Sequence, residues 1–147
     1  MKITEALLAE HVVFHNLFDY VERAAPRLRT LGEIRTLAGL LNAMQESHGQ
    51  IEDELVMEPL AHCLDNLGQN EAIHAEHQHI EEVLAQVRSS RDLKQAKKLL
   101  HTAVVVSRQH FDREERVIFP LAEKWLKPKT LQTLGSEWVA KRKQVVG

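Results

Sequence analysis

Apolar residues recur every three or four positions along most of this chain, which is the spacing of one face of an α-helix. The first such stripe, interrupted by a single histidine, consists of Ile3, Leu7, His11, Phe14, Phe18 and Val21. Pro26 follows the stripe and disfavours continuation of a helix, because it lacks a backbone N–H group. The pattern therefore predicts a first helix over about residues 4–25.

A second helix is predicted to begin after Thr30, where Thr30-Leu-Gly-Glu33 has the spacing of a capping box. Its inward stripe consists of Ile34, Leu37, Leu41, Met44, His48, Ile51 and Leu55. We expect this helix to end near residues 59–63, because Pro59 lies there. Residues 65–70, Asp-Asn-Leu-Gly-Gln-Asn, are mostly polar and contain a glycine, which predicts a turn.

The same spacing predicts two more long helices, over about residues 70–89 and 92–122, separated at Ser89-Ser90. Pro120 is expected to loosen the last turn of the second of these helices. Residues 127–129 are predicted to form a linker, and residues 130 to about 143 a short fifth helix that packs on the others.

Four long helices with short connections predict an all-α, up-down-up-down four-helix bundle. At 147 residues the chain is long enough for one substantial core, so we read residues 1–147 as a single domain. The bundle would span about residues 4–123, and the short fifth helix would lie in a C-terminal extension of about residues 124–147.

The composition of the chain mainly excludes several classes of protein. The formal net charge is −2, so the chain has no excess of positive charge that would indicate a nucleic-acid partner. No apolar run is long enough to span a membrane, and the first residues carry charges too early for a signal peptide. The single cysteine, Cys63, excludes an internal disulfide framework and favours a reducing compartment. We therefore expect a soluble cytoplasmic protein.

A duplicated histidine–carboxylate pattern carries the candidate chemistry. His48 and Glu52 are four residues apart, and so are His110 and Glu114. On a helix, residues at this spacing lie on one face with Cβ atoms about 5–6 Å apart. Each pair can therefore hold a metal ion between its imidazole and its carboxylate.

A second repeat supplies two more ligands, because Ala9-Glu10-His11 recurs as Ala75-Glu76-His77. The two triplet histidines lie about seven residues into their helices, whereas the histidine–glutamate pairs lie about eight to twelve residues before the ends of theirs. At 1.5 Å per residue, antiparallel helices would bring all six groups to one level, roughly 10–18 Å from one end of the bundle. The six predicted metal ligands are His11, His48, Glu52, His77, His110 and Glu114.

A lone histidine on an apolar stripe is usually a hydrogen-bonded core residue, and a metal-free network of histidines and glutamates is the alternative reading. Buried carboxylates without cations are costly, however, which favours bound ions. His15 and His74 lie near the predicted ligands and could be further metal ligands or could hydrogen-bond to ligands. Asp53 and Glu115 are expected beside the ligands or exposed. The histidines expected at the surface or boundary are His62, His79 and His101.

Mixed imidazole and carboxylate ligation suits iron, zinc, manganese or copper. Structural zinc prefers four ligands, often with thiolates, whereas six ligands that include two carboxylates able to bridge suit a pair of ions. The residues themselves leave the identity of the metal open.

The segment 110–121, His-Phe-Asp-Arg-Glu-Glu-Arg-Val-Ile-Phe-Pro-Leu, resembles the HxxxEExxLFPxL signature of the hemerythrin-like family, the HHE cation-binding domain. Segments 9–18 and 75–77 resemble the motifs of its first and third helices, and the resemblance covers about residues 4–123. It implies a non-haem di-iron centre with two iron ions (Fe2+/Fe3+) and a bridging oxo or hydroxo group. Glu52 and Glu114 would bridge, and the four predicted histidines would be terminal ligands.

The sequence departs from the oxygen-carrying members of that family. The carriers have two histidines four apart on the third helix, where this chain has Ile73 and His77, with His74 displaced by one position. They also have an aspartate five residues after the histidine of the fourth helix, where this chain has Glu115. The chain therefore resembles the symmetric HHE type more than the five-histidine carriers.

The resemblance implies a protein that binds O2 or another small diatomic ligand and acts in oxygen or iron binding or sensing. Apolar residues such as Phe14, Ile51 and Phe111 are expected to wall the ligand pocket. The alternative is a di-iron enzyme or iron donor acting on NO or peroxide in oxidative or nitrosative stress defence. The sequence leaves open which of these it is, and it identifies no protein partner.

Overall fold

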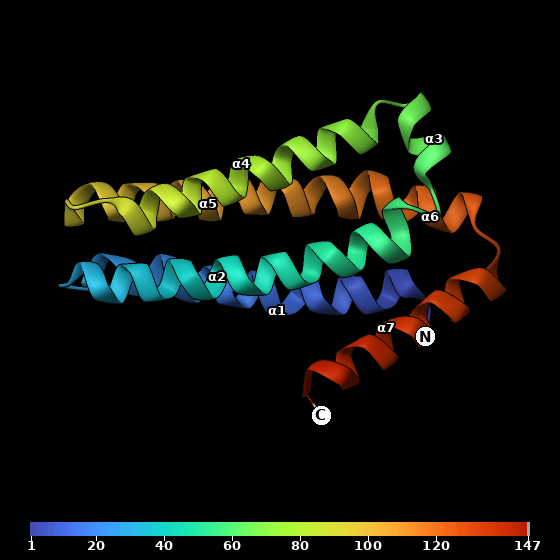
Figure 1. The fold of residues 1–147 in the computed structure, drawn as a ribbon, viewed down its shortest axis with the longest axis horizontal. Helices are drawn as coiled ribbons and strands as arrows, with labels where there is room; N and C mark the ends of the chain where they lie inside the picture. The colour runs from blue at the N-terminus through green and yellow to red at the C-terminus, as the bar shows by residue number, and fades with distance from the viewer. Residues whose placement is uncertain (147) are drawn as a thin grey trace.

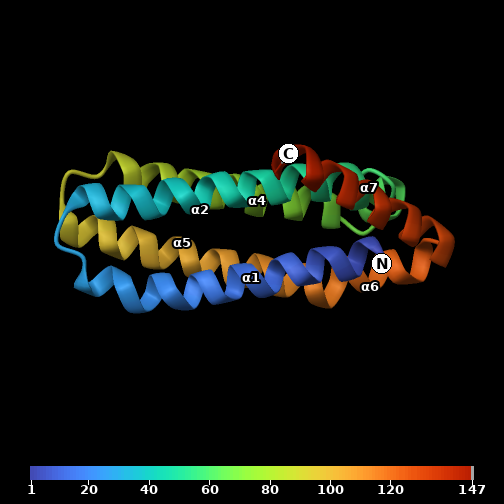
Figure 2. The ribbon, with the colours of Figure 1, turned by 90° about the horizontal axis from the view of Figure 1, so that it is seen from below.

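The computed structural model describes residues 1–146, and no β-strand occurs among them. Its long helices are α1 (Ile3–Ala24), α2 (Leu31–Glu52), α4 (Gln69–Ser89) and α5 (Leu93–Arg113). Each runs antiparallel to the preceding one, and the four occupy the corners of a bundle (Figure 1) (Figure 2). The predicted all-α up-down-up-down bundle is thus confirmed. Within residues 1–146, no helix is both long enough and apolar enough to cross a bilayer.

Local capping sets where the helices begin. The Thr30 hydroxyl accepts a hydrogen bond from the Glu33 N–H group at 3.2 Å, and the Glu33 carboxylate accepts one from the Thr30 N–H group at 3.2 Å. This is the predicted capping box at the start of α2, and it satisfies amide groups that have no partner within the helix. Asp92 caps α5 in a similar way by accepting from the Gln95 N–H group.

The second and fourth predicted helices are not regular α-helices throughout, because each contains a π-helical turn at its histidine–glutamate pair. One turn covers Asp53–Met57 and the other Glu114–Ile118. In the first, the Glu58 N–H group donates to the Asp53 carbonyl at 2.8 Å, one residue farther along the chain than in an α-helix. Such turns add a residue to a helix and frequently occur at functional sites.

Three short or displaced elements also differ from the expectation. α3 (Ala61–Asn66) occupies the region where the sequence predicted a helix end and a turn. α6 (Phe119–Trp125) continues directly from the π-helical turn and carries Pro120 as its second residue, so the predicted fourth helix extends past this proline. α7 (Pro128–Val146) begins within the predicted linker, at a proline, which is a favoured residue for the first position of a helix. It is longer than the predicted fifth helix.

The core is divided into two apolar clusters by a buried polar layer. One cluster lies toward the α1–α2 connection and includes Phe18, Leu41, Leu84 and Leu100. The other lies toward α3 and α6 and includes Leu7, Leu55, Ile73 and Ile118. α1, α2 and α4 contribute to both clusters, whereas α5 contributes only to the first and is followed by residues of the second, such as Ile118. The candidate ligands lie between the two clusters. The polar residues buried in this layer are His11, His48, Glu52, His110 and Glu114.

α7 runs back along the outside of the bundle and packs on α1 (Figure 1). Leu131 is fully buried in the second apolar cluster and anchors the start of α7. Gly135 lies so close to the chain's N-terminus that a Cβ atom there would overlap the carbonyl group of Met1. A glycine at this position therefore permits the close approach of α7 to α1.

We expect Gly135→Ala to lower the free energy of unfolding by about 1–3 kcal/mol, because the added methyl group would overlap backbone atoms of Met1, which must then shift. Urea denaturation followed by circular dichroism measures this loss. Gly39→Ala is the matched control, since no atom lies within 4 Å of its added Cβ and alanine favours the helix. Equal effects of the two substitutions would show that the contact with Met1 is not restrictive.

Candidate metal centre

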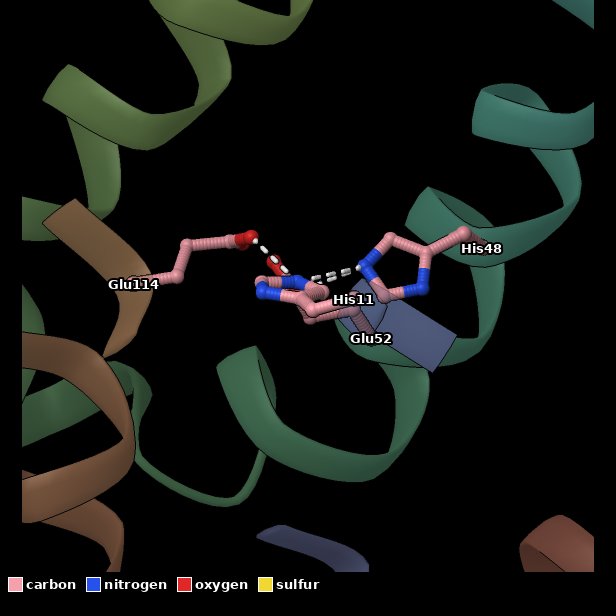
Figure 3. Close-up of side chains that lie close together, drawn as sticks. All are labelled: His11, His48, Glu52 and Glu114. Carbon is pink, nitrogen blue, oxygen red and sulfur yellow. Dashed lines mark hydrogen bonds and ion pairs between the residues drawn. The ribbon is translucent and has the colours of Figure 1, made fainter. Parts of the chain in front are cut away.

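The polar layer brings together side chains from all four long helices. α1 supplies His11, α2 supplies His48 and Glu52, α4 supplies His77, and α5 with its π-helical turn supplies the remaining pair, His110 and Glu114. All are buried except His77, which is half-buried. Figure 3 shows His11 between His48 and Glu114, with Glu52 close by. These are the six residues predicted from the two repeats.

The six side chains form two overlapping groups. The first contains His11 and His48, the second contains His77 and His110, and both contain Glu52 and Glu114. Within each group, one ligand atom from each residue lies within 4.8 Å of the ligand atoms of the others. The arrangement therefore has two candidate metal positions that share two carboxylates.

Imidazole nitrogens and carboxylate oxygens converge at short distances in this layer. His11 Nε2 lies 3.2 Å from His48 Nε2 and 3.2 Å from Glu114 Oε1 (Figure 3). The two pairs within helices are alike, with His48 Nε2 3.3 Å from Glu52 Oε2 and His110 Nε2 3.4 Å from Glu114 Oε2. Nε2 is therefore the ring nitrogen that these three histidines turn toward the centre.

The donor set fits metal cations. Both carboxylate oxygens of Glu52 and of Glu114 are buried without a hydrogen-bond partner, and so are both ring nitrogens of His110. Burying an unpartnered ionised group costs several kcal/mol, and cations between the two groups would satisfy these atoms together. The unpartnered atoms disfavour the alternative of a metal-free hydrogen-bonded network.

Burial keeps two of the histidines in the form that binds metal. Burial, with a further contribution from the charge of His48, lowers the pKa of His11 from 6.5 to about 3. Burial, followed by the charge of His110, lowers the pKa of His77 to about 4. Both imidazoles are therefore neutral near pH 7, which leaves a lone pair for coordination.

Two further groups, His48 and Glu114, favour their protonated forms when no cation is present. Burial acts to lower the pKa of His48, but the adjacent carboxylates of Glu10 and Glu52 outweigh it and raise the pKa to about 9. Burial and the negative charge of Glu52 raise the pKa of Glu114 well above 4.5. Metal binding near neutral pH must therefore displace protons from this layer.

A carboxylate outside the layer orients His48. Glu10 Oε2 lies 2.6 Å from His48 Nδ1, the nitrogen that points away from the centre. A carboxylate at the outer nitrogen of a histidine holds the proton there, fixes the ring and directs the other nitrogen to the metal. Glu10 itself is held by Trp138 and Arg142 of α7, at 2.8 and 2.6 Å.

Two further carboxylates face outer nitrogens at longer range. Glu115 Oε2 lies 3.8 Å from His11 Nδ1, and Glu76 Oε1 lies 3.8 Å from His110 Nδ1. Glu115 is half-buried beside the ligands, which is one of the two placements expected for it. Three of the four central histidines thus have a glutamate near the ring nitrogen that faces outward.

Sequence reasoning missed Glu10 and Glu76 as parts of the site. The signal was present, because both belong to the Ala-Glu-His triplets from which only His11 and His77 were selected. Each of these glutamates faces a histidine of the neighbouring helix rather than the histidine that follows it in the triplet. Only the packing of the helices reveals that pairing.

The two additional candidates lie outside both groups of ligand atoms. His15 is half-buried, and its Nε2 atom lies 3.4 Å from Glu115 Oε2. His74 is exposed; its Nδ1 atom lies 2.8 Å from the Asn70 carbonyl oxygen and its Nε2 atom 3.5 Å from Asp53. The structure thus brings neither residue to the centre. The three histidines predicted at the surface or boundary, His62, His79 and His101, are exposed.

We expect His74→Ala to leave the metal content unchanged, because its imidazole makes only exposed contacts. His79→Ala, another exposed histidine of α4, is the matched control. Metal analysis after loading and desalting measures both variants. A loss of one ion in His74→Ala alone would place His74 among the ligands.

A cavity of about 180 Å³ reaches this layer between α2 and α4. His48, His77, His110 and Phe111 line its inner end, and Gly49 leaves space beside the His77 ring. Phe111 also stacks on His11, with ring centroids 4.0 Å apart and an interplanar angle of 7°. The cavity offers a small molecule a route to the second candidate metal position.

The predicted apolar wall is only partly assembled at this cavity. Phe111 lines it, whereas Phe14 lines a separate cavity between α1 and α2, beside His48. Ile51 points into the apolar cluster on the α3 side of the layer and lines neither cavity. Phe14 and Phe111 belong to the first apolar cluster and Ile51 to the second, so the three residues do not lie on one side of the polar layer.

The family comparison covers this site. The model of the hemerythrin HHE cation-binding domain matches residues 2–122, a segment that contains all six central residues and ends within α6. No curated protein and no solved structure matches the chain. The match covers most of the chain, and the buried histidines and glutamates lie within it. The chain therefore belongs to the hemerythrin family of HHE cation-binding domains.

Proposed function

We propose that this protein holds two iron ions in the polar layer and binds O2 or another small diatomic ligand there. The observation that carries the proposal is the pair of overlapping ligand groups that share two buried, unpartnered glutamates. His11 and His48 would hold one ion, His77 and His110 the other, and Glu52 and Glu114 would bridge them. Family membership supports metal binding by this layer.

Iron is the metal that this donor set and the family favour together. Four imidazoles and two carboxylates provide nitrogen and oxygen ligands without thiolate, a combination that suits iron. When bound, a reduced iron pair supplies electrons for reversible binding of O2. The two shared carboxylates would hold the ions close together and balance part of their charge.

The protein's own residues support binding of a small ligand by shielding the centre. Apolar clusters close the polar layer on both sides, so water reaches it less readily than from a surface site. The cavity between α2 and α4 admits a small molecule, and its wall at Phe111 is apolar. Removing water from a site strengthens its electrostatic interactions and suppresses side reactions.

An anaerobic titration with Fe(II), followed by exposure to air, tests this proposal. We expect about two ions per chain, and ligand-to-metal charge-transfer bands between the near-ultraviolet and visible after O2 is admitted. Reversal of the bands when O2 is removed supports a binding or sensing role. No uptake, or one weakly held ion without such bands, would contradict the di-iron centre.

Stopped-flow mixing of the reduced protein with O2, NO and H2O2 distinguishes the proposed role from the enzymatic alternative. We expect single-step binding of O2 without multiple turnovers. Repeated turnover of NO or peroxide would instead assign the centre to a stress-defence enzyme, with the same six residues as ligands.

A further inference from the structure

The C-terminal helix α7 contacts Glu10, which in turn contacts His48, although α7 lies outside the segment that matches the family model. Arg142 Nε donates to Glu10 Oε1 at 2.6 Å, and Trp138 Nε1 donates to the same oxygen at 2.8 Å. The other oxygen of Glu10 lies 2.6 Å from His48 Nδ1. Glu10 therefore links α7 to a candidate metal ligand through its two oxygens.

Arg142 makes a second contact beside the same ligand. Its Nη1 atom donates to the Ser47 hydroxyl at 2.7 Å, one residue before His48 in α2. The Glu10 side chain is 15% exposed and that of Arg142 24%, so solvent screens this ion pair less than one at the open surface. α7 is thus joined to both α1 and α2 at the level of the centre.

The other half of the repeat has no equivalent contact with α7 among the described residues. Glu76, which corresponds to Glu10, pairs with Arg113 at 2.7 Å, and Arg113 belongs to α5 itself. Glu76 is also farther from its histidine, 3.8 Å from His110 Nδ1. The two metal positions are therefore similar in their ligands but differ in what holds those ligands.

We propose that α7 is a clamp that orients His48 through Glu10, so that it strengthens metal binding at the His11–His48 position and not at the His77–His110 position. The proposal rests on the proposed two-metal function. Arg142 and Trp138 are positioning residues, since they act on the ligand only through Glu10. Loss of such outer contacts typically weakens metal binding by about 10–100-fold, because ring orientation and basicity both change.

Calorimetric titration of the full chain with Fe(II) or Co(II) under anaerobic conditions tests the clamp. In Arg142→Ala we expect one binding step to weaken, by at most the roughly 10–100-fold that follows loss of a ligand's direct partner, while the other stays unchanged. Lys141→Ala is the matched control, because Lys141 is the preceding residue of α7 and pairs with Glu54 at the surface. We expect both of its binding steps to match those of the parent protein.

Trp138→Phe provides a second variant that removes only one N–H donor and keeps most of the apolar ring. We expect it to weaken the same step in the same direction, and by less than Arg142→Ala. Arg142→Lys, which keeps the charge, should restore part of the affinity. Unchanged affinities in both Arg142→Ala and Trp138→Phe, or equal weakening of both steps, would overturn the clamp.

Nuclear magnetic resonance of the metal-free protein separates failure of the clamp from failure of the proposed function. We expect a downfield Nδ1–H resonance from His48, protected by its hydrogen bond to Glu10. In Arg142→Ala this resonance should broaden through exchange with water, and in Lys141→Ala it should persist. If the parent protein binds no metal, the two-metal function fails, and an unchanged resonance in Arg142→Ala still overturns the clamp.

Discussion

Glu114→Ala is expected to reduce the metal content from about two ions per chain to at most one weakly held ion. Glu114 belongs to both groups of ligand atoms, and its oxygens lie 3.2 Å from His11 Nε2 and 3.4 Å from His110 Nε2. Its removal therefore takes a ligand from both metal positions at once. Metal analysis after loading with Fe(II) and desalting under anaerobic conditions measures the loss.

Asp112→Ala is the matched control for this variant. Asp112 is a carboxylate of the same helix, but it is exposed and pairs only with the exposed Arg116. We expect its metal content to equal that of the parent protein. Retention of two tightly held ions in Glu114→Ala would show that Glu114 does not bridge, and would exclude the shared-carboxylate arrangement.

Glu114→Gln is expected to reverse the order of stability between the metal-free and metal-loaded proteins. Without metal, the variant should be more stable than the parent, because it removes a buried carboxyl group whose ionised form is disfavoured by burial and by the charge of Glu52. With metal, the parent should gain about 4 kcal/mol at a free metal concentration of 1,000 times Kd, and the variant should gain little. Urea denaturation with and without a chelator measures both differences.

The advantage of metal-free Glu114→Gln should depend on pH in a defined direction. The folded-state pKa of Glu114 is raised above its ordinary value of 4.5, so its contribution to stability is fully present below pH 4.5 and is lost as pH rises toward the raised pKa. The difference between variant and parent should therefore grow above about pH 4.5, by at most about 1.4 kcal/mol per pH unit. A difference that shrinks with rising pH would contradict the raised pKa.

Much of the helical architecture could be predicted because its causes are local. The end of a helix before Pro26 and the capping box at Thr30 each depend on a few neighbouring residues. In the structure, α1 ends at Ala24 and α2 begins at Leu31. The histidine–glutamate pairs share a helical face for the same reason. Antiparallel packing then brought the six residues to one level, as their positions along the helices predicted. Their role as metal ligands stays a prediction.

The π-helical turns at Asp53–Met57 and Glu114–Ile118 could not be predicted from periodicity. A single added residue changes the hydrophobic period over only one turn, which a stripe of apolar residues does not reveal. The exclusion of His15 and His74 from the ligand groups likewise depends on where each ring points. His15 turns to Glu115, and His74 turns to the surface of α4.

By itself, the sequence determined the helices, their inward faces, the common level of six candidate ligands and the family. These features follow from local spacing and from a repeat within the chain. Only the tertiary structure decided which glutamate faces which histidine and that α7 reaches the centre, because Trp138 and Arg142 lie 128 and 132 residues after Glu10. Contacts between such distant residues arise from the packing of whole helices, and no local pattern in either segment specifies them.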